Sequence, residues 1–141
     1  MPRAIFIGRF QPFHKGHLSA VRHIEKKVGS CIICLTVCAR DQKNPFSVAN
    51  RKKMIRTAGV TQRLALIHDQ SSDAAWSWMI LKRFKPDVIF SNNPWTRRCF
   101  RGKNVEVERI PVTYKISGTR VRALIKKGET GKDTFPREQQ R

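Results

Sequence analysis

Short apolar runs alternate with amphipathic segments along the whole chain. Five apolar runs predict buried β-strands, at residues 4–8, 31–37, 64–68, 88–90 and 105–110. The segments between them carry apolar residues at helical spacing, and the first such stripe comprises Leu18, Val21, Ile24 and Val28. Strands that alternate with helices are typical of a mainly parallel sheet with helices on both faces. We therefore expect an α/β fold.

Polar residues at the expected helix starts support this assignment. Ser47 and Asp73 are the expected N-caps of helices that run to about residues 58 and 84. Asn93 is expected to cap a short helix whose first position is Pro94. With 141 residues, 40% of them hydrophobic, the chain has the size of one domain. We expect that domain to cover residues 1–128, followed by a polar and poorly ordered tail at 129–141.

The chain lacks the sequence features of membrane and secreted proteins. It has no run of eighteen apolar residues and no apolar signal region at its N-terminus, so we expect a cytoplasmic protein outside the membrane. Cys31 and Cys34 have CxxC spacing, but they lie in a predicted strand, where residues three apart point to opposite faces. We therefore expect buried structural cysteines and no metal site.

The chain is strongly basic. It carries 29 Lys and Arg against 10 Asp and Glu, a formal net charge of +19. Positive charge suits a protein whose ligands are polyanions, but a handful of arginines would be enough for that purpose. The surplus is dispersed, as is usual for a solvated surface, yet its size also favours nonspecific nucleic-acid binding that weakens with salt. Both interpretations stay open.

A turn rich in glycine and histidine follows the first predicted strand. The segment GRFQPFHKGH, residues 8–17, places His14 and His17 three positions apart at the start of a predicted helix. A helix N-terminus presents free backbone N–H groups to an anion, and Gly16 permits close approach of a ligand. The pattern favours phosphate binding, although a lone HxGH is more often an ordinary helix start.

A second helix start lies about one hundred residues further along. The segment ISGTRVR, residues 116–122, puts Ser117 at the N-cap of a short helix that is expected to end at Gly128. Its two hydroxyls and two arginines also suit a phosphate. Taken alone, however, the segment is more often simply a basic amphipathic helix that has a serine cap.

Together the two segments resemble the HxGH and ISSTxxR signatures of the nucleotidylyltransferase superfamily. The form GRFQPFHKGH is similar to that of archaeal-type nicotinamide mononucleotide adenylyltransferases, and the resemblance runs over about residues 2–135. It implies a Rossmann-like fold and direct transfer of AMP from ATP to the phosphate of a mononucleotide. Such a transfer is promoted by positioning and by charge stabilisation, so cations and hydrogen-bond donors matter more than a nucleophile.

The resemblance also implies roles for individual residues at the ATP site. The catalytic positions are Arg9, His14, His17 and Arg122. The other ATP-binding positions are Gly8, Phe10, Gly16, Asn93, Ser117, Gly118 and Thr119. Mg²⁺ is expected to arrive bound to ATP, because the sequence offers no evident cluster of carboxylates for it.

The acceptor residues follow from the same resemblance. Trp76 is expected to stack on nicotinamide, and Asp69, Asp73 and Arg51 are expected to make further acceptor contacts. Each has a structural alternative: Trp76 fits a helix core together with Trp78, Met79 and Ile80, Arg51 fits a solvated surface, and Asn93 is also explained as a cap.

Two departures from the family pattern limit the prediction. Thr36-Val37-Cys38-Ala39 stands where the family tends to have a small Gly-Ser-Ala segment near the acceptor phosphate. A further family helix would follow near Phe135-Pro136, where this chain ends; relatives often assemble, and we expect a homo-oligomer.

Our leading hypothesis is adenylyl transfer from ATP to nicotinamide mononucleotide, giving NAD and pyrophosphate. The alternatives are transfer to another phosphorylated acceptor, and a basic nucleic-acid-binding protein that keeps the fold.

Overall fold

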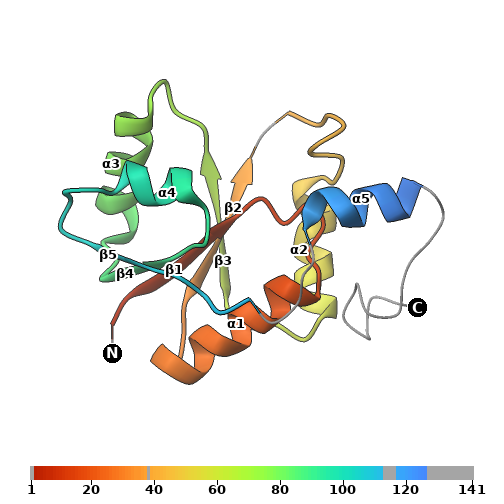
Figure 1. Ribbon diagram of the computed structural model, residues 1–141, viewed down its shortest axis with the longest axis horizontal. Coiled ribbons are helices and arrows are strands. Elements are labelled where there is room, and N and C mark those ends of the chain that lie inside the picture. The colour runs from red at the N-terminus through yellow and green to blue at the C-terminus, as the bar shows by residue number, and fades with distance from the viewer. Residues whose placement is uncertain (1, 38, 113–116, 127–141) are drawn as a thin grey trace.

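A parallel sheet forms the centre of the computed structural model, which describes residues 2–37, 39–112 and 117–126 (Figure 1). Its strands, in the order β3-β2-β1-β4-β5, are β1 (Ala4–Gly8), β2 (Ile32–Val37), β3 (Arg63–His68), β4 (Val88–Phe90) and β5 (Glu106–Glu108). The helices are α1 (Lys15–Val28), α2 (Val48–Thr57), α3 (Asp73–Phe84), α4 (Pro94–Cys99) and α5 (Gly118–Lys126). All the strand pairs are parallel, which confirms the predicted α/β class.

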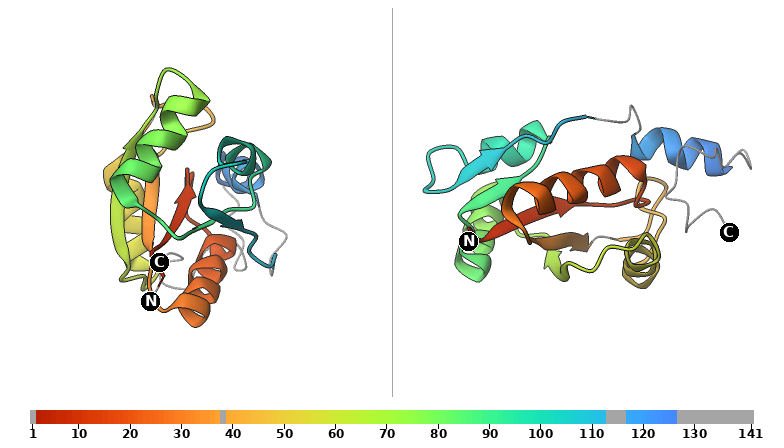
Figure 2. Two further views of the ribbon diagram at one scale, coloured as in Figure 1. Left: turned by 90° about the vertical axis from the view of Figure 1, so that its left-hand side faces the viewer. Right: turned by 90° about the horizontal axis from the view of Figure 1, so that it is seen from below.

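The two faces of the sheet bury separate apolar clusters. Phe6 and its neighbours on the same face pack with α1 and α2, whereas Ile5 and Ile7 point the other way and pack with α3 and α4. This division follows from the two-residue period of side chains along a strand. Figures 1 and 2 show the sheet between these pairs of helices. The apolar runs seen in the sequence are therefore strands covered on both faces, as expected.

Of the expected N-caps Ser47, Asp73 and Asn93, two agree with the structure. Ser47 caps α2 and Asn93 caps α4, with Pro94 in the first turn, as predicted. The prediction for Asp73 was wrong: the N-cap of α3 is Ser72, whose Oγ accepts a hydrogen bond from the Ala75 amide at 3.1 Å. Asp73 occupies the first turn, where a carboxylate is favoured by the helix dipole.

The predicted end of the last strand differs from the structure, and the predicted end of the last helix lies outside the described residues. β5 is shorter than predicted, because Ile110 exchanges both of its backbone hydrogen bonds with the side chain of Asn92 rather than with a strand. The expected helix end at Gly128 and the tail at 129–141 lie outside the described residues. Of the helices that the structure describes, none is long and apolar enough to span a bilayer.

The CxxC pair is divided between the two cores. Cys31 packs in the cluster on the α1 side, and Cys34 packs in the cluster on the α3 side, so the two thiols cannot ligate one metal. Burial raises the pKa of both thiols to about 12. They are structural core residues, as their place in a strand predicted.

The order of the strands locates the binding crevice. The chain proceeds from β1 outward to β2 and β3, and then returns to pair β4 with the other side of β1. In open parallel sheets, ligands bind outside the carboxyl ends of the strands at such a reversal. The segments that follow β1 and β4 are therefore the ones that position a site, and β1 leads directly into the HxGH turn.

Candidate active site

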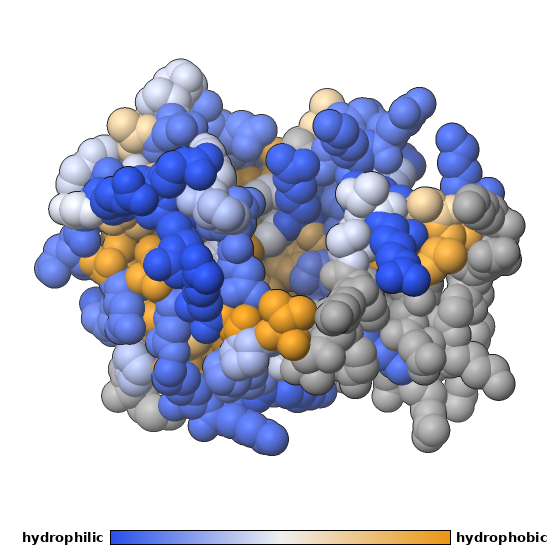
Figure 3. Space-filling view, viewed as in Figure 1, coloured by the Kyte–Doolittle hydropathy of each residue, from blue (hydrophilic) through white to orange (hydrophobic). Residues whose placement is uncertain are grey.

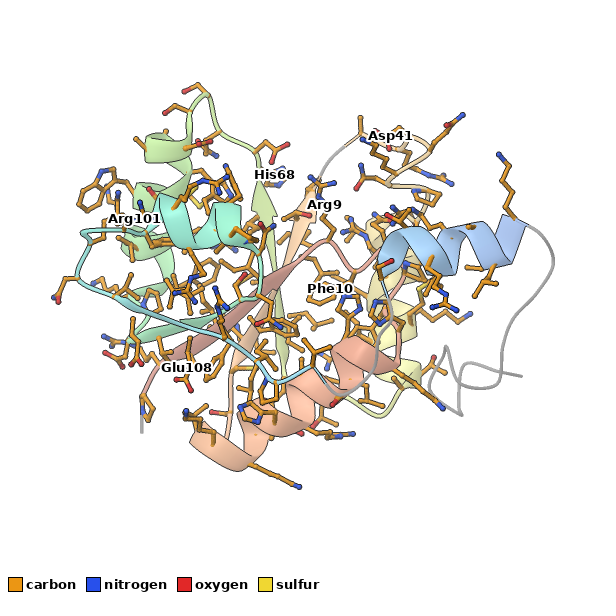
Figure 4. All side chains as sticks on the ribbon, in the orientation of Figure 1. Arg9, Phe10, Asp41, His68, Arg101 and Glu108 are labelled. Carbon is orange, nitrogen blue, oxygen red and sulfur yellow. The ribbon has the colours of Figure 1, made fainter. Side chains whose placement is uncertain are left out.

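Both sequence motifs line one pocket at the reversal of strand order. The pocket has a volume of about 340 Å³ and opens beside the carboxyl ends of β1 and β4. It brings together eight residues predicted for the ATP site: Gly8, Phe10, His14, Gly16, His17, Asn93, Ser117 and Gly118. The other three, Arg9, Thr119 and Arg122, line an adjoining cleft of about 760 Å³ between the 42–46 loop and α5. Figure 4 shows Arg9 between α4 and α5.

The two histidines begin α1 by capping each other's backbone. Nδ1 of His14 accepts a hydrogen bond from the Gly16 amide at 3.1 Å, and Nδ1 of His17 accepts one from the His14 amide at 3.2 Å. This is a capping box built from imidazoles. Because each Nδ1 acts as an acceptor, the proton of each neutral ring must sit on Nε2. The motif thus fixes the tautomer of both rings.

Burial keeps both rings neutral in the ligand-free protein. Desolvation lowers the pKa of His14 to about 4, and it lowers the pKa of His17 well below its usual value, with a further contribution from nearby His14. The rings therefore offer Nε2–H donors to a ligand rather than fixed positive charges. Bound phosphates would favour the protonated forms and raise these pKa values.

Aromatic packing holds the histidines in place. The His14 and His17 rings stack with centroids 3.8 Å apart, and Phe13 stacks on His17 at 5.5 Å. A Cβ at Gly16 would lie 2.9 Å from Cε1 of His14, and one at Gly8 would lie 2.7 Å from the Phe10 ring. Both glycines thus make room for the protein's own rings, and both also line the pocket.

A direct hydrogen bond connects the two motifs. Nη1 of Arg122 donates to the backbone carbonyl of Gln11 at 2.7 Å, and Nη2 donates to Thr119 Oγ1 at 3.3 Å. Ser117 caps α5, as predicted, and its Oγ accepts a hydrogen bond from the Arg120 amide. The guanidinium therefore lies beside the HxGH turn, although 111 positions separate the two residues.

A second pocket adjoins the first on the side of α3 and α4. It has a volume of about 480 Å³ and is lined by Arg9, Thr36, Asn44, Asp69, Trp76, Asn93 and Trp95. Asn93 lines both pockets. Among the described residues, Thr36 Oγ1 and Asn44 Oδ1 are buried without a hydrogen-bond partner. Buried polar atoms are normally paired, so these two oxygens lack the partner that such atoms usually have.

The predicted acceptor residues separate into two groups. Asp69 and Trp76 line the second pocket, and Trp76 is also a core residue, 4% exposed and packed on Trp95 and Phe100. The interpretation of Trp78 as core was wrong, because this side chain is 61% exposed. Asp73 is exposed in the first turn of α3 and is not among the residues that line the pocket.

Arg51 is buried rather than solvated. Its side chain is 2% exposed and donates hydrogen bonds to the carbonyls of Arg9, Thr36 and Ser47 at 2.8, 2.8 and 3.3 Å. It thereby joins the turn after β1, the end of β2 and the start of α2. Two of these three carbonyls belong to Arg9 and Thr36, which line the second pocket.

Two amide side chains that sequence reasoning missed connect the backbone segments around the site by hydrogen bonds. Gln11 exchanges two hydrogen bonds with the backbone of Phe46, and Asn92 does the same with Ile110. Gln11 lies within the 8–17 segment and Asn92 follows β4, which was the available signal. Their partners, Phe46 and Ile110, become neighbours only in the folded chain.

The neutral histidines predict a dependence of stability on pH. An unfolded His14 titrates near 6.5 and the folded one near 4, so the unfolded chain takes up the proton first as pH falls. The free energy of unfolding should therefore rise between pH 4 and 6.5, by up to roughly 3 kcal/mol from this residue. Urea titrations across this range will measure the effect. His14→Asn keeps an N-cap side chain without a titrating ring and should flatten the profile; an unchanged slope would contradict the assignment.

Comparison with known proteins agrees with this geometry. Residues 5–124 match the cytidylyltransferase-like family. The chain is 33% identical to a nicotinamide-nucleotide adenylyltransferase of Methanolobus tindarius, over 96% of this chain and 84% of the relative. It is 35% identical to the corresponding protein of Thermoplasma volcanium, over 95% and 81%.

A solved structure shows the same fold. It is a bifunctional NMN adenylyltransferase/ADP ribose pyrophosphatase from Francisella tularensis, complexed with AMP and a manganese ion. The TM-score is 0.74 at 24% identity, over 96% of this chain and 44% of the bifunctional protein. With both motifs in one pocket and this set of relatives, the chain belongs to the cytidylyltransferase-like family, as a relative of archaeal nicotinamide-nucleotide adenylyltransferases.

Proposed function

We propose that this protein transfers AMP from ATP to nicotinamide mononucleotide, giving NAD and pyrophosphate. One observation carries the proposal: the N-termini of α1 and α5 meet at a pocket that shares Asn93 with a second pocket walled by Trp76 and Trp95. A donor nucleotide in the first pocket and a pyridine nucleotide in the second would bring their phosphates together beside Asn93 and Arg9. The relatives that carry this name support the choice of acceptor.

The reaction needs groups that stabilise charge. An oxygen of the acceptor phosphate forms a bond to the α-phosphorus of ATP, and the bond from that phosphorus to the departing pyrophosphate breaks. Nε2–H groups of His14 and His17 would donate to the phosphates, and the guanidinium of Arg122 would hold the leaving pyrophosphate, which gains negative charge. The hydroxyls of Ser117 and Thr119 lie at the same helix start and would add hydrogen bonds.

Mg²⁺ fits this site as part of the nucleotide substrate. Within the described residues, no group of three His, Cys, Asp or Glu side chains is placed to hold a metal ion. A magnesium ion that arrives with ATP and keeps several waters would need no such group.

The second pocket offers hydrogen-bond acceptors to a nucleoside. The carboxylate of Asp69 and the free oxygens of Thr36 and Asn44 would accept from ribose hydroxyls or from an amide, while the indoles provide an apolar surface for a ring. Thr36 belongs to the segment that departs from the family pattern. For this reason, adenylyl transfer to another phosphorylated acceptor is our second candidate.

An acceptor panel separates these possibilities. Purified protein with Mg²⁺ would be given ATP or CTP together with nicotinamide mononucleotide, nicotinate mononucleotide, flavin mononucleotide or ribose 5-phosphate, and pyrophosphate release would be recorded. We expect turnover with ATP and nicotinamide mononucleotide. Release with a different acceptor alone would favour the second candidate, and none with any pair would refute both. Light scattering on the same samples will test the expected homo-oligomer.

Trp95 provides a sharper test of the acceptor pocket than Trp76. Because Trp76 is a core residue, its replacement by alanine should cost about 3–5 kcal/mol and obscure any binding effect. Trp95 is half-buried and lines the same pocket. Trp95→Ala should raise the KM for the acceptor by roughly tenfold while changing the KM for ATP little. Steady-state kinetics with each substrate varied in turn will show this; an equal rise in both constants would contradict the assignment.

A further inference from the structure

A basic surface with one exposed indole lies away from the active site. Trp78 on α3 is 61% exposed, and Nζ of Lys103 lies 5.4 Å from its ring centroid. A single exposed apolar side chain is common on protein surfaces, so it is the cations around this indole that point to a ligand. Lys82 follows Trp78 by one helical turn and is also exposed.

A small pocket rich in cations adjoins this indole. It has a volume of about 270 Å³, and its lining includes Arg97, Arg101 and Lys103 but no carboxylate. Lys103 both lines this pocket and covers Trp78, so the aromatic surface and the cations are contiguous. Figure 4 shows Arg101 on the opposite side of α4 from Arg9, and Figure 3 shows strongly hydrophilic side chains over α4 and its surroundings. We call Trp78, Lys82, Arg97, Arg101 and Lys103 the α3–α4 basic surface.

The surrounding charge is mainly positive. Between residues 73 and 107, the stretch that includes the whole pocket lining, the sequence carries seven basic residues against three acidic ones, Asp73, Asp87 and Glu106. Asp73 begins α3, more than one turn before Trp78, and Asp87 accepts a hydrogen bond from the Arg3 amide at the opposite end of the sheet. An anionic partner is therefore attracted to this surface.

We propose that the α3–α4 basic surface binds single-stranded nucleic acid, with a base stacked on Trp78 and backbone phosphates on Arg97, Arg101 and Lys103. A flat exposed indole beside cations is the pattern by which such strands are held without sequence preference. A duplex hides its base faces and cannot use the indole. The inference is independent of the adenylyl transfer proposed above.

Fluorescence anisotropy of labelled dT20 and rU20 tests the proposal over a range of salt concentrations. The full chain should bind both oligonucleotides at low salt. Trp78→Ala should weaken binding about tenfold and leave adenylyl transfer unchanged, because the residue lies outside the site. No binding to either strand, or equal binding by wild type and Trp78→Ala, would overturn the proposal.

A charge-matched pair of variants separates this surface from the general basic character of the chain. Arg101→Ala/Lys103→Ala removes two charges from the α3–α4 basic surface, and Lys52→Ala/Lys53→Ala removes two exposed charges from α2. The first pair should reduce the slope of log affinity against log salt by about 1.4, and the second should change it far less. Equal losses from both pairs would overturn the proposal. So would a Trp78→Ala variant whose only change is in oligomeric state by sedimentation, because that result would make the surface a contact between copies.

Discussion

His17→Asn should lower the turnover number at least a hundredfold and leave the fold intact. The Asn side chain places an oxygen where Nδ1 of His17 stands, so it can still accept the hydrogen bond from the His14 amide that begins α1. It is too short to replace the Nε2–H donor. If that donor stabilises charge on the reacting phosphates, its loss costs about 10²–10³ in rate.

His17→Gln is the matched control, because its amide takes the place of Nε2, whereas the amide of asparagine takes the place of Nδ1. Its terminal amide reaches the position of Nε2 and can donate, but it has no acceptor at the position of Nδ1. We expect its rate to stay within about tenfold of the wild type, while losing the cap lowers the free energy of unfolding by about 1 kcal/mol. Both variants lose the stacking on Phe13 and His14, so that contribution cancels between them. A His17→Asn protein with near-normal turnover would remove His17 from the catalytic group.

The fold was largely predictable because its determinants are local. Apolar runs with the period of covered strands, together with caps such as Ser47 and Asn93, place most of the elements. The wrong N-cap of α3 arose from two adjacent residues, Ser72 and Asp73, that are both good caps; only the backbone geometry selects one. Likewise, Trp76 and Trp78 look alike in sequence, and only their opposite directions on α3 separate core from surface.

The candidate site was predictable as a set of residues but less so in its physical state. The resemblance of the two motifs predicted that His14, His17 and Ser117 share one site, and they line one pocket. The charge state of the two histidines, however, depends on burial beside Phe10 and Phe13, which the tertiary fold positions. Neutral imidazoles with a fixed tautomer are donors already oriented before ATP arrives. In the proposed reaction, the positive charge at the phosphates would then come mainly from Arg122 and Arg9, which line the adjoining cleft.

Arg51→Met should lower the free energy of unfolding by about 3–5 kcal/mol in the ligand-free protein. The guanidinium donates to the backbone carbonyls of Arg9, Thr36 and Ser47, which methionine would leave without these bonds in a buried place. For a chain of this length, the loss corresponds to a fall in melting temperature of roughly 10 °C or more. Arg51→Lys should recover part of it, since one ammonium group can reach some of these carbonyls but cannot reproduce the planar fork.

This variant also decides between two roles for Arg51. If the residue only positions the backbone, Arg51→Met will unfold at lower temperature and lower urea concentration before any substrate is added. Ser47→Ala, which removes the cap of α2, provides a control that weakens the same region by about 1 kcal/mol without touching the carbonyls of Arg9 and Thr36. A protein that melts like the wild type but has a raised KM for the acceptor would instead make Arg51 a direct acceptor ligand. We expect the first result, because a side chain 2% exposed and bound to three carbonyls has its donors directed at the protein rather than at the pocket.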